Sequence, residues 1–246
     1  MTSKKPLGRI PAERIRLLEL PALPAGVVER FEKLADLTGT ISDVCDTLGL
    51  RCVIPAAVLA PIVPTAAGKR IVGPALTMRN IKRTVDIFKA VSDNSNGMGE
   101  TEAHNLAKPG DVLVVEGVTG CSNMGGLSAT TGRRQGEIGA IIDGSVRDPD
   151  AYARLGWPVW CRGYTPITGK WRLETIEING TVQVGGVQCS PGDLVCADAA
   201  GTAIIPRARV EEVLALSEKF DKGDAKRQAD IESGVSMHEM AGKSYK

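Results

Sequence analysis

Two adjacent residues of opposite charge follow an apolar run in the segment GAIIDGSVRDPDAYARLG, residues 139–156. Arg147 and Asp148 come where a strand formed by that run should end. We expect neighbours in such a place to point in different directions, so that each charge meets a partner of its own. A carboxylate is a ligand for a hard divalent cation, and a guanidinium binds a substrate oxyanion. The structural alternative is that Asp148 caps a helix beginning at Pro149.

A glycine-rich loop, GVTGCSNMGG over residues 117–126, offers a second kind of binding group. It lies between a buried strand and a predicted helix over residues 127–135, and backbone N–H groups at a helix start bind carboxylate or phosphate. The loop is not a Walker loop, because no Gly-Lys-Ser/Thr follows, and it lacks the GxGxxG spacing of dinucleotide sites. The alternative is a flexible turn.

The elements that must position these groups alternate between strand and helix, which indicates parallel pairing. We predict strands within residues 109–117, 138–144 and 157–163, with a short helix over 151–155. The loop and the Arg-Asp pair follow consecutive strands, and the carboxyl ends of parallel strands lie side by side. One cleft should therefore hold backbone donors, a guanidinium and a carboxylate, which suits a small anionic oxo acid with a divalent metal. Tyr164 and Thr165 follow the next strand and are further candidates to line it.

The outer parts of the chain contain further helices and a β-rich block. The segment PGD occurs twice, before residues 112 and 194, and we interpret it as a recurring turn that feeds a strand. The last third is β-rich, with Asn-Gly and Gly-Gly turns. Other predicted elements are a helix over 27–37, a second helix capped by Ser42 and ended by Gly49, a strand over 69–80 interrupted at Gly73-Pro74, a short helix over 84–92 and an amphipathic helix over 208–220.

Composition and charge narrow the function. The chain has 246 residues, 43% hydrophobic and 24% charged, as in ordinary globular proteins. A net charge of +1, with scattered Lys and Arg, predicts neither a nucleic-acid partner nor a membrane surface. The apolar segment over residues 53–67 is too short, and too interrupted by proline, to span a bilayer. Because the N-terminus lacks the apolar stretch of a signal peptide, we expect a cytoplasmic protein.

The cysteines and histidines limit the metal chemistry. The 6 cysteines form no CxxC pair and are expected to be buried small hydrophobic residues. With only 2 histidines, a multi-histidine metal site is excluded, so any metal should be a hard ion held by carboxylate and water. His104 is expected to be a hydrogen-bonded or surface residue, with a proton relay as the alternative. The stretch GKWRLE, residues 169–174, is predicted to be a solvated loop.

Several of these segments resemble the RraA-like family, which includes class II 4-hydroxy-4-methyl-2-oxoglutarate / 4-carboxy-4-hydroxy-2-oxoadipate aldolases and the RraA regulators of ribonuclease E. The similarity runs from about Leu34 to Leu216, and GAIIDGSVRD is its most specific part. It implies an α/β fold: a layered αββα-type single domain over residues 25–220, with a partly parallel central sheet and a β-rich C-terminal part. Residues 1–24 would form an N-terminal arm and residues 221–246 a helical or flexible tail.

The resemblance also implies roles for the candidate residues. Asp148 would hold Mg²⁺ or Mn²⁺, Arg147 would contact the oxygen that becomes the enolate, and the backbone at Gly125, Gly126 and Leu127 would bind the substrate carboxylate. Regulators tend to have lost this Asp, so its presence favours an enzyme over the alternative, a non-catalytic regulator that binds a protein partner. Family members assemble as homotrimers or homohexamers.

Two positions depart from the aldolase pattern: Gly126 and Ala151 stand where aldolases often carry acidic residues. The base that a retro-aldol cleavage requires is therefore left open. Decarboxylation of an oxaloacetate-type acid needs no such base. We accordingly expect a metal-dependent lyase for a small 2-oxo (di)carboxylic acid, acting by retro-aldol cleavage, by decarboxylation or by both.

Overall fold

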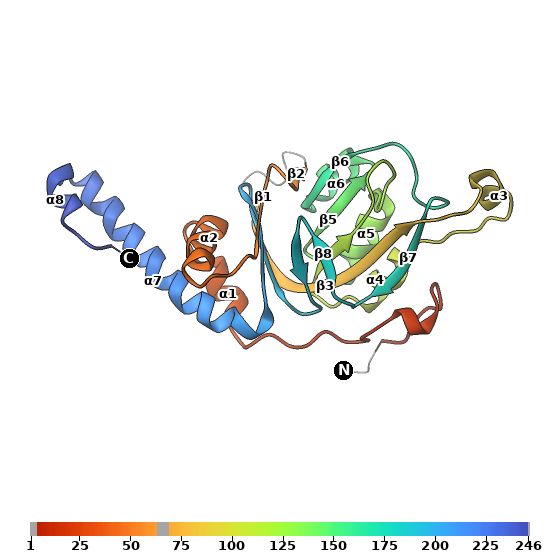
Figure 1. The fold of residues 1–246 in the computed structure, drawn as a ribbon, viewed down its shortest axis with the longest axis horizontal. Coiled ribbons are helices and arrows are strands. Elements are labelled where there is room, and N and C mark those ends of the chain that lie inside the picture. The colour runs from red at the N-terminus through yellow and green to blue at the C-terminus, as the bar shows by residue number, and fades with distance from the viewer. Residues whose placement is uncertain (1–3, 63–68, 246) are drawn as a thin grey trace.

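The computed structural model describes residues 4–62 and 69–245, so part of the apolar segment over 53–67 lies outside the described residues. Within them, the chain folds into helix, sheet, sheet and helix layers (Figure 1). The main sheet has nine strands in the order β1-β11-β10-β3-β4-β5-β6-β2, and β7 pairs with β3 off this path. Pairs β3–β4, β4–β5 and β5–β6 are parallel and the others antiparallel. The expected layered αββα architecture with a partly parallel sheet is confirmed.

The strands of the first half are β1 (Val53–Pro55), β2 (Ala60–Ile62), β3 (Ile71–Lys82), β4 (Val112–Glu116), β5 (Gly139–Val146) and β6 (Val159–Tyr164). The β-rich C-terminal part contains β7 (Leu173–Ile178), β8 (Val182–Val184), β9 (Val187–Cys189), β10 (Leu194–Ala197) and β11 (Gly201–Ile205). The helices are α1 (Val27–Glu32), α2 (Leu37–Thr47), α3 (Ile87–Ser92), α4 (Glu100–Leu106), α5 (Gly126–Gln135), α6 (Pro149–Leu155), α7 (Val210–Glu232) and α8 (Met237–Ala241).

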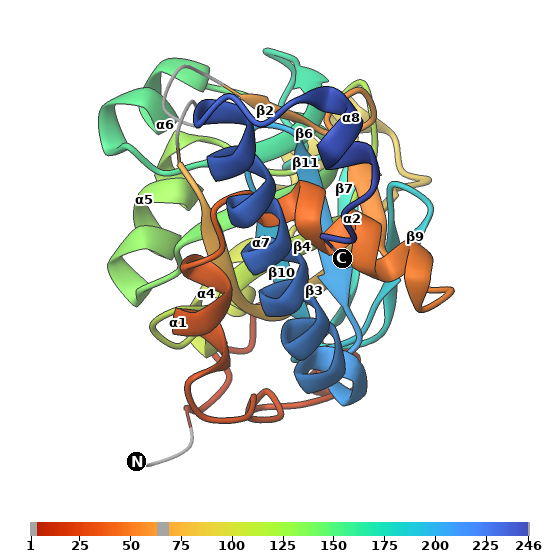
Figure 2. The same cartoon turned by 90° about the vertical axis from the view of Figure 1, so that its left-hand side faces the viewer.

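Alternating side chains along β4 show why the layers form. Val112 and Val114 pack into a core between the two halves of the curved sheet. Leu113 and Val115 face the opposite way, into a core shared with α4, α5 and α6. Successive residues of a strand point to opposite faces, so a continuous apolar strand must be covered on both. A third core joins α1, α2 and α7 to the outer strands, and Figure 2 shows these helices in front of the sheet.

Two predicted elements are corrected. The strand over 69–80 is not interrupted at Gly73-Pro74, because β3 runs through both residues. Pro74 occupies the last pair with β10, where its missing N–H is tolerated, and a Cβ at Gly73 would lie 2.1 Å from the Gly110 carbonyl oxygen. The helix expected over 27–37 ends at Glu32, and α2 begins after Asp36, so Ser42 lies inside a helix and caps nothing.

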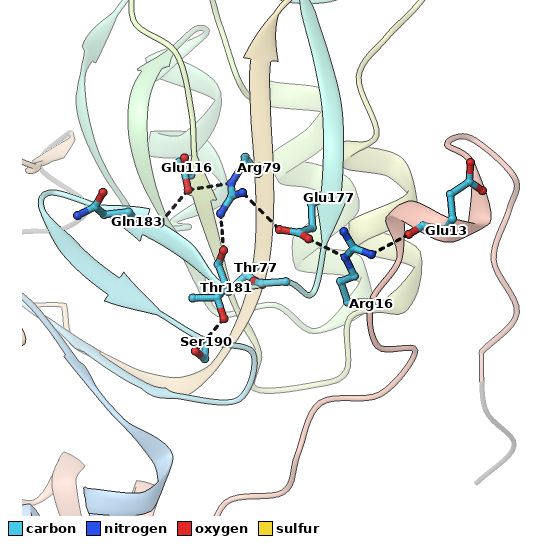
Figure 3. A network of polar contacts seen from close by, with 10 residues as sticks. Glu13, Arg16, Thr77, Arg79, Glu116, Glu177, Thr181, Gln183 and Ser190 are labelled. Atoms are coloured by element: carbon cyan, nitrogen blue, oxygen red, sulfur yellow. Dashed lines mark hydrogen bonds and ion pairs between the residues drawn. The ribbon is translucent and has the colours of Figure 1, made fainter.

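The N-terminal segment, predicted as an arm outside the core, is docked on the body. It runs along the lower edge in Figure 1, and its Ile10 side chain is buried in the core beside α4. Arg16 joins a polar network shown in Figure 3: its Nε donates to Glu177 Oε1 at 2.7 Å, and Glu177 Oε2 lies 3.6 Å from Arg79 Nη1. Arg79 Nε also donates to Glu116 Oε2 at 2.9 Å. The network links the segment to β3, β4 and β7.

The C-terminal part forms the longest helix, α7, which extends with α8 away from the body (Figure 1). The expected boundary at residue 221 falls inside α7 rather than at a break in the helix. None of the helices among the described residues is both long and apolar enough to cross a membrane.

The two PGD segments form the same turn, as interpreted from the sequence. Asp111 Oδ2 accepts a hydrogen bond from the Lys108 N–H, and Asp193 Oδ2 accepts one from the Ser190 N–H, each at 2.7 Å. The glycine before each aspartate has a positive φ, 95° and 81° respectively. Glycine adopts this conformation without a steric cost, which explains the repeated dipeptide.

Candidate functional site

The glycine-rich loop and the Arg-Asp pair lie side by side, as the strand order predicted. The loop follows β4, and the pair follows β5, its parallel neighbour. The contact between them is direct, because the N–H of Gly126, the first residue of α5, donates to Asp148 Oδ2 at 3.0 Å. The first N–H groups of a helix have no acceptor within the helix, so the carboxylate at this place accepts a hydrogen bond from one of them. Its negative charge also interacts favourably with the positive end of the helix dipole.

The backbone of Asp148 explains how one residue can reach two groups. Its φ of 59° and ψ of 52° are in the left-handed region, which aspartate adopts more readily than most residues. This turn corrects our expectation that the neighbours point apart: Asp148 Oδ2 lies 3.4 Å from Arg147 Nε. Both side chains are about half exposed, at 41% and 48%, so water screens their attraction and it adds little stability.

The structural alternative for Asp148 is only partly correct. Helix α6 does begin at Pro149, with Asp148 at the capping position. The Asp148 side chain, however, makes no capping hydrogen bond to α6. It turns instead toward the start of α5, where it accepts the hydrogen bond from Gly126.

The surroundings of Asp148 fit a weakly coordinated hard cation. Both contacts of the carboxylate use Oδ2, which leaves Oδ1 for a ligand. Among residues 4–62 and 69–245 no group of three His, Cys, Asp or Glu side chains could hold a metal. Mg²⁺ commonly binds through one or two carboxylates and keeps water and substrate oxygens as its other ligands, so one carboxylate suits it.

A small pocket of about 120 Å³ lies next to this pair. Arg147 and Gly125 line this pocket. Asp148 does not line it, but its carboxylate contacts the Arg147 side chain. Tyr164 and Thr165, which were candidates to line the cleft, are not in its wall. A larger cavity of about 330 Å³ contains neither Arg147 nor Asp148. The pocket is lined by Asn96, Met98, Glu100, Ser122, Met124, Gly125, Arg147, Thr168, Gly169 and Lys170.

Glu100 is a pocket residue that no sequence pattern indicated. Its Oε2 is buried and has no hydrogen-bond partner in the described part of the chain. Burial raises the pKa of this carboxyl above 4.5, although a hydrogen bond from its own backbone and the charges of His104 and Arg147 oppose the shift. Glu100 and His104 are four residues apart on one helix, a spacing that places them on one face. That spacing was visible in the segment ETEAH, but nothing in it indicated a pocket.

Lys170 was also missed, because GKWRLE was predicted to be a solvated loop. Gly169 and Lys170 in fact line the pocket, and a Cβ at Gly169 would lie 2.2 Å from the Ser122 carbonyl oxygen. The glycine therefore permits the close crossing of this segment over the glycine-rich loop. The Lys170 ammonium lies 5.3 Å from the centre of the Trp171 ring, within cation–π distance.

The remaining candidates from the sequence, His104 and the cysteines, are buried side chains outside the pocket wall. His104 is buried; its Nδ1 is 2.7 Å from Glu137 Oε1 and its Nε2 is 2.7 Å from Ser128 Oγ. It is a hydrogen-bonded histidine, as expected, and it does not line the pocket. All six cysteines are free and buried, which confirms their interpretation as small hydrophobic residues.

Comparison with known proteins identifies the family. A family model described as Aldolase/RraA, RraA-like, matches residues 38–204, more than half of the chain. The chain belongs to the RraA-like family. It is 32% identical over 176 residues to a protein of Halalkalibacterium halodurans named "Putative 4-hydroxy-4-methyl-2-oxoglutarate aldolase". That match covers 71% of this chain and 78% of the relative.

Solved structures agree with this RraA-like assignment. An uncharacterized protein from Pseudomonas syringae has the same fold with a TM-score of 0.73 at 24% identity, over 89% of this chain and 98% of its own. RraAS2 from Streptomyces coelicolor, described as an unusual member of the RNase ES inhibitor RraA family, has a TM-score of 0.65 at 25% identity. It matches 87% of this chain and 99% of its own.

The two positions at which this RraA-like protein departs from the aldolase pattern touch each other. A Cβ built on Gly126 would lie 2.5 Å from the Cβ of Ala151, far inside van der Waals contact. Helices α5 and α6 therefore pack at this point only because residue 126 has no side chain. An acidic side chain at residue 126 has no room unless residue 151 or the helices move.

Proposed function

We propose that this RraA-like protein is a divalent-metal-dependent lyase that acts on a small 2-oxo (di)carboxylic acid through a pyruvate-type enolate. The observation that supports it best is the convergence of Arg147, Asp148 and the start of α5 beside one small pocket. A pocket of about 120 Å³ suits a ligand of few non-hydrogen atoms. The relatives named as aldolases support the same class of reaction.

Each group has a part in binding. The guanidinium of Arg147 lines the pocket and would bind the keto oxygen, whose negative charge grows as the C3–C4 bond breaks. The backbone at Gly125, Gly126 and Leu127 would hold the substrate carboxylate at the start of α5. Because the Gly126 N–H also donates to Asp148, the same helix start orients the carboxylate that would hold the metal.

Asp148 would hold Mg²⁺ or Mn²⁺ in this proposal. When bound, such an ion withdraws electron density from the 2-oxo group and so favours cleavage of the neighbouring bond. Arg147 adds a fixed positive charge that needs no reorganisation during the reaction. A protein that supplies a single carboxylate should bind the ion weakly, so the activity should depend on added metal and be lost with a chelator.

The packing of Gly126 against Ala151 bears on the choice between the two bond cleavages. An aldolase needs a base for the C4 hydroxyl proton, and neither residue can act as one. Decarboxylation of an oxaloacetate-type acid releases CO₂ without that base. We therefore propose decarboxylation as the main reaction and retro-aldol cleavage as the second choice. Both reactions produce the same pyruvate enolate.

A non-catalytic regulator that binds a protein partner is the second candidate. The similarity to RraAS2, described within an RNase inhibitor family, favours it. This alternative gives Arg147 and Asp148 no chemical task, although the left-handed backbone of Asp148 and its contact with α5 are specific features. From the family resemblance we also propose a homotrimer or homohexamer, and Phe88 of α3, which is 84% exposed with Val85 and Val91 exposed beside it, is a candidate contact between copies.

Pyruvate release tests the proposal directly. Oxaloacetate and a panel of 4-hydroxy-2-oxo acids would be incubated with the protein and Mg²⁺ or EDTA. We expect metal-dependent pyruvate release, and a fall in Asp148→Asn to the level seen with EDTA, because the change removes the charge that would hold the ion and keeps the side-chain shape. The matched control is Asp150→Asn, an exposed acid in the first turn of α6 that does not line the pocket. Activity that survives both EDTA and Asp148→Asn would exclude the metal-dependent lyase.

A further inference from the structure

One acidic side chain lines the pocket beside Arg147, and it is Glu100. It is the first residue of α4, a helix on a different part of the chain from the loop and the Arg-Asp pair. Its Oε2 is buried without a hydrogen-bond partner in the described residues. Buried carboxyl oxygens in folded proteins are nearly always bonded, and an exception at a functional pocket calls for an explanation. A ligand in the pocket would supply the missing partner.

Burial and the neighbouring charges determine how readily the Glu100 carboxyl keeps its proton. Burial is the largest influence and raises the pKa, because it penalises the ionised form. A hydrogen bond from the Glu100 backbone is the largest opposing influence, followed by His104 on the same helix and Arg147 from the end of β5, and together they do not cancel the effect of burial. Lys170 is the other charged residue of the pocket wall. A carboxyl that keeps its proton more readily than usual can donate it to a bound molecule.

Resting on the enolate chemistry proposed above, we propose that Glu100 is a catalytic residue that donates the proton to C3 of the pyruvate enolate. Breaking the C3–C4 bond leaves its electron pair as a C2–C3 double bond, with the negative charge on the C2 oxygen beside Arg147. The Glu100 O–H proton then adds to C3 and the C2 carbonyl re-forms, which gives pyruvate. The Glu100 carboxylate recovers its proton from water. The enolate oxygen and the carbon to be protonated are thus served by two groups that line one pocket.

Residues 126 and 151 cannot supply this proton. Neither has an acidic side chain, and the packing of their helices leaves no room for an acid there. Of the two cationic side chains in the pocket wall, Arg147 is assigned to the enolate oxygen, and Lys170 has its ammonium over the Trp171 ring. Glu100 in contrast has an oxygen, Oε2, with no hydrogen-bond partner among the residues that the structure describes.

Hydrogen exchange of pyruvate separates this step from bond cleavage. Wild-type protein with Mg²⁺ is mixed with pyruvate in D₂O, and loss of the methyl proton signal is followed by NMR. The reverse of the proposed step removes a C3 proton, so we expect catalysed exchange in the wild type and a fall in kcat of about 100-fold in Glu100→Gln. KM should change little, because glutamine keeps the size and polarity of the side chain. Glu100→Asp, which keeps the acid, should restore part of the exchange.

The outcomes distinguish the two proposals. If wild-type protein neither exchanges pyruvate protons nor releases pyruvate from any oxo acid, the proposed lyase fails and the role of Glu100 fails with it. If the wild type is active and folded Glu100→Gln exchanges protons within about twofold of it, only the role of Glu100 is overturned. The control Asp150→Asn removes an exposed acid of α6 that does not line the pocket, and it should match the wild type. An equal loss in that control would also overturn the assignment, since the effect would then not be specific to the acid in the pocket.

Discussion

Replacing Gly126 with alanine tests whether the contact between α5 and α6 is as tight as the structure shows. The new Cβ would lie 2.5 Å from the Cβ of Ala151, where carbon atoms normally pack at about 3.5–4.0 Å. Relieving that overlap requires one helix to shift, and such overpacking costs about 1–3 kcal/mol of unfolding free energy. The opposite sign is expected if the space is open, because glycine to alanine in a compatible backbone stabilises by about 0.4–1 kcal/mol. The sign of the change therefore decides the question.

A double-mutant cycle measures the coupling free energy between residues 126 and 151. Ala151→Gly alone should cost roughly 1 kcal/mol, because it places glycine within α6. Combined with Gly126→Ala it removes the clashing atom, so the double variant should be more stable than the sum of the single changes by about 1 kcal/mol or more. Urea unfolding at fixed protein concentration measures all four proteins, and equal m-values would show that the comparison is valid.

The control for this cycle is Leu127→Ala, at the next residue of α5. The Leu127 side chain is 84% exposed, so its loss should change stability by no more than about 0.5 kcal/mol. A Gly126→Ala variant as stable as the wild type, or a double variant that shows no coupling, would refute the packing argument. It would also remove our reason for expecting that an acid at residue 126 has no room beside Ala151.

Two further predictions concern the turn before β4 and the N-terminal segment. Burial raises the pKa of Asp111 from 3.8 to about 6. Its favourable contribution to the free energy of unfolding is therefore complete below pH 3.8 and is lost as the pH rises through about 6. Asparagine does not ionise, so Asp111→Asn should abolish this decrease in stability. In urea unfolding, the free energy of unfolding of the variant relative to the wild type should be higher at about pH 8 than at about pH 4. Glu102 accepts hydrogen bonds from the N–H groups of Leu7 (2.7 Å) and Arg9 (3.0 Å), so Glu102→Ala should cost about 1–3 kcal/mol. Limited proteolysis should then cut residues 4–10 earlier than in the wild type, and unchanged cleavage would contradict this role.

Much of the fold follows from patterns that are local in the sequence. The alternation of apolar strands and helices over residues 109–164 predicts parallel pairing, and the pairs β4–β5 and β5–β6 confirm it. The PGD turns and the Gly-Gly hairpin between β8 and β9 depend on glycine conformations that a few residues determine. Boundaries were less predictable: α1 and α2 share one apolar spacing because both pack on the same core, which hid the break between them.

The sequence alone determined that a guanidinium and a carboxylate follow β5, next to a glycine-rich loop that follows β4. Strand order suffices for this, because the carboxyl ends of adjacent parallel strands share one edge. Only the tertiary structure decided that Asp148 turns through a left-handed backbone to contact Arg147 and Gly126, and that Gly126 packs on Ala151. It alone placed Glu100 and Lys170 in the pocket, since these side chains come from α4 and from a loop after β6. The physical reason is that periodicity specifies which face of an element is buried, whereas a pocket depends on where separate segments cross.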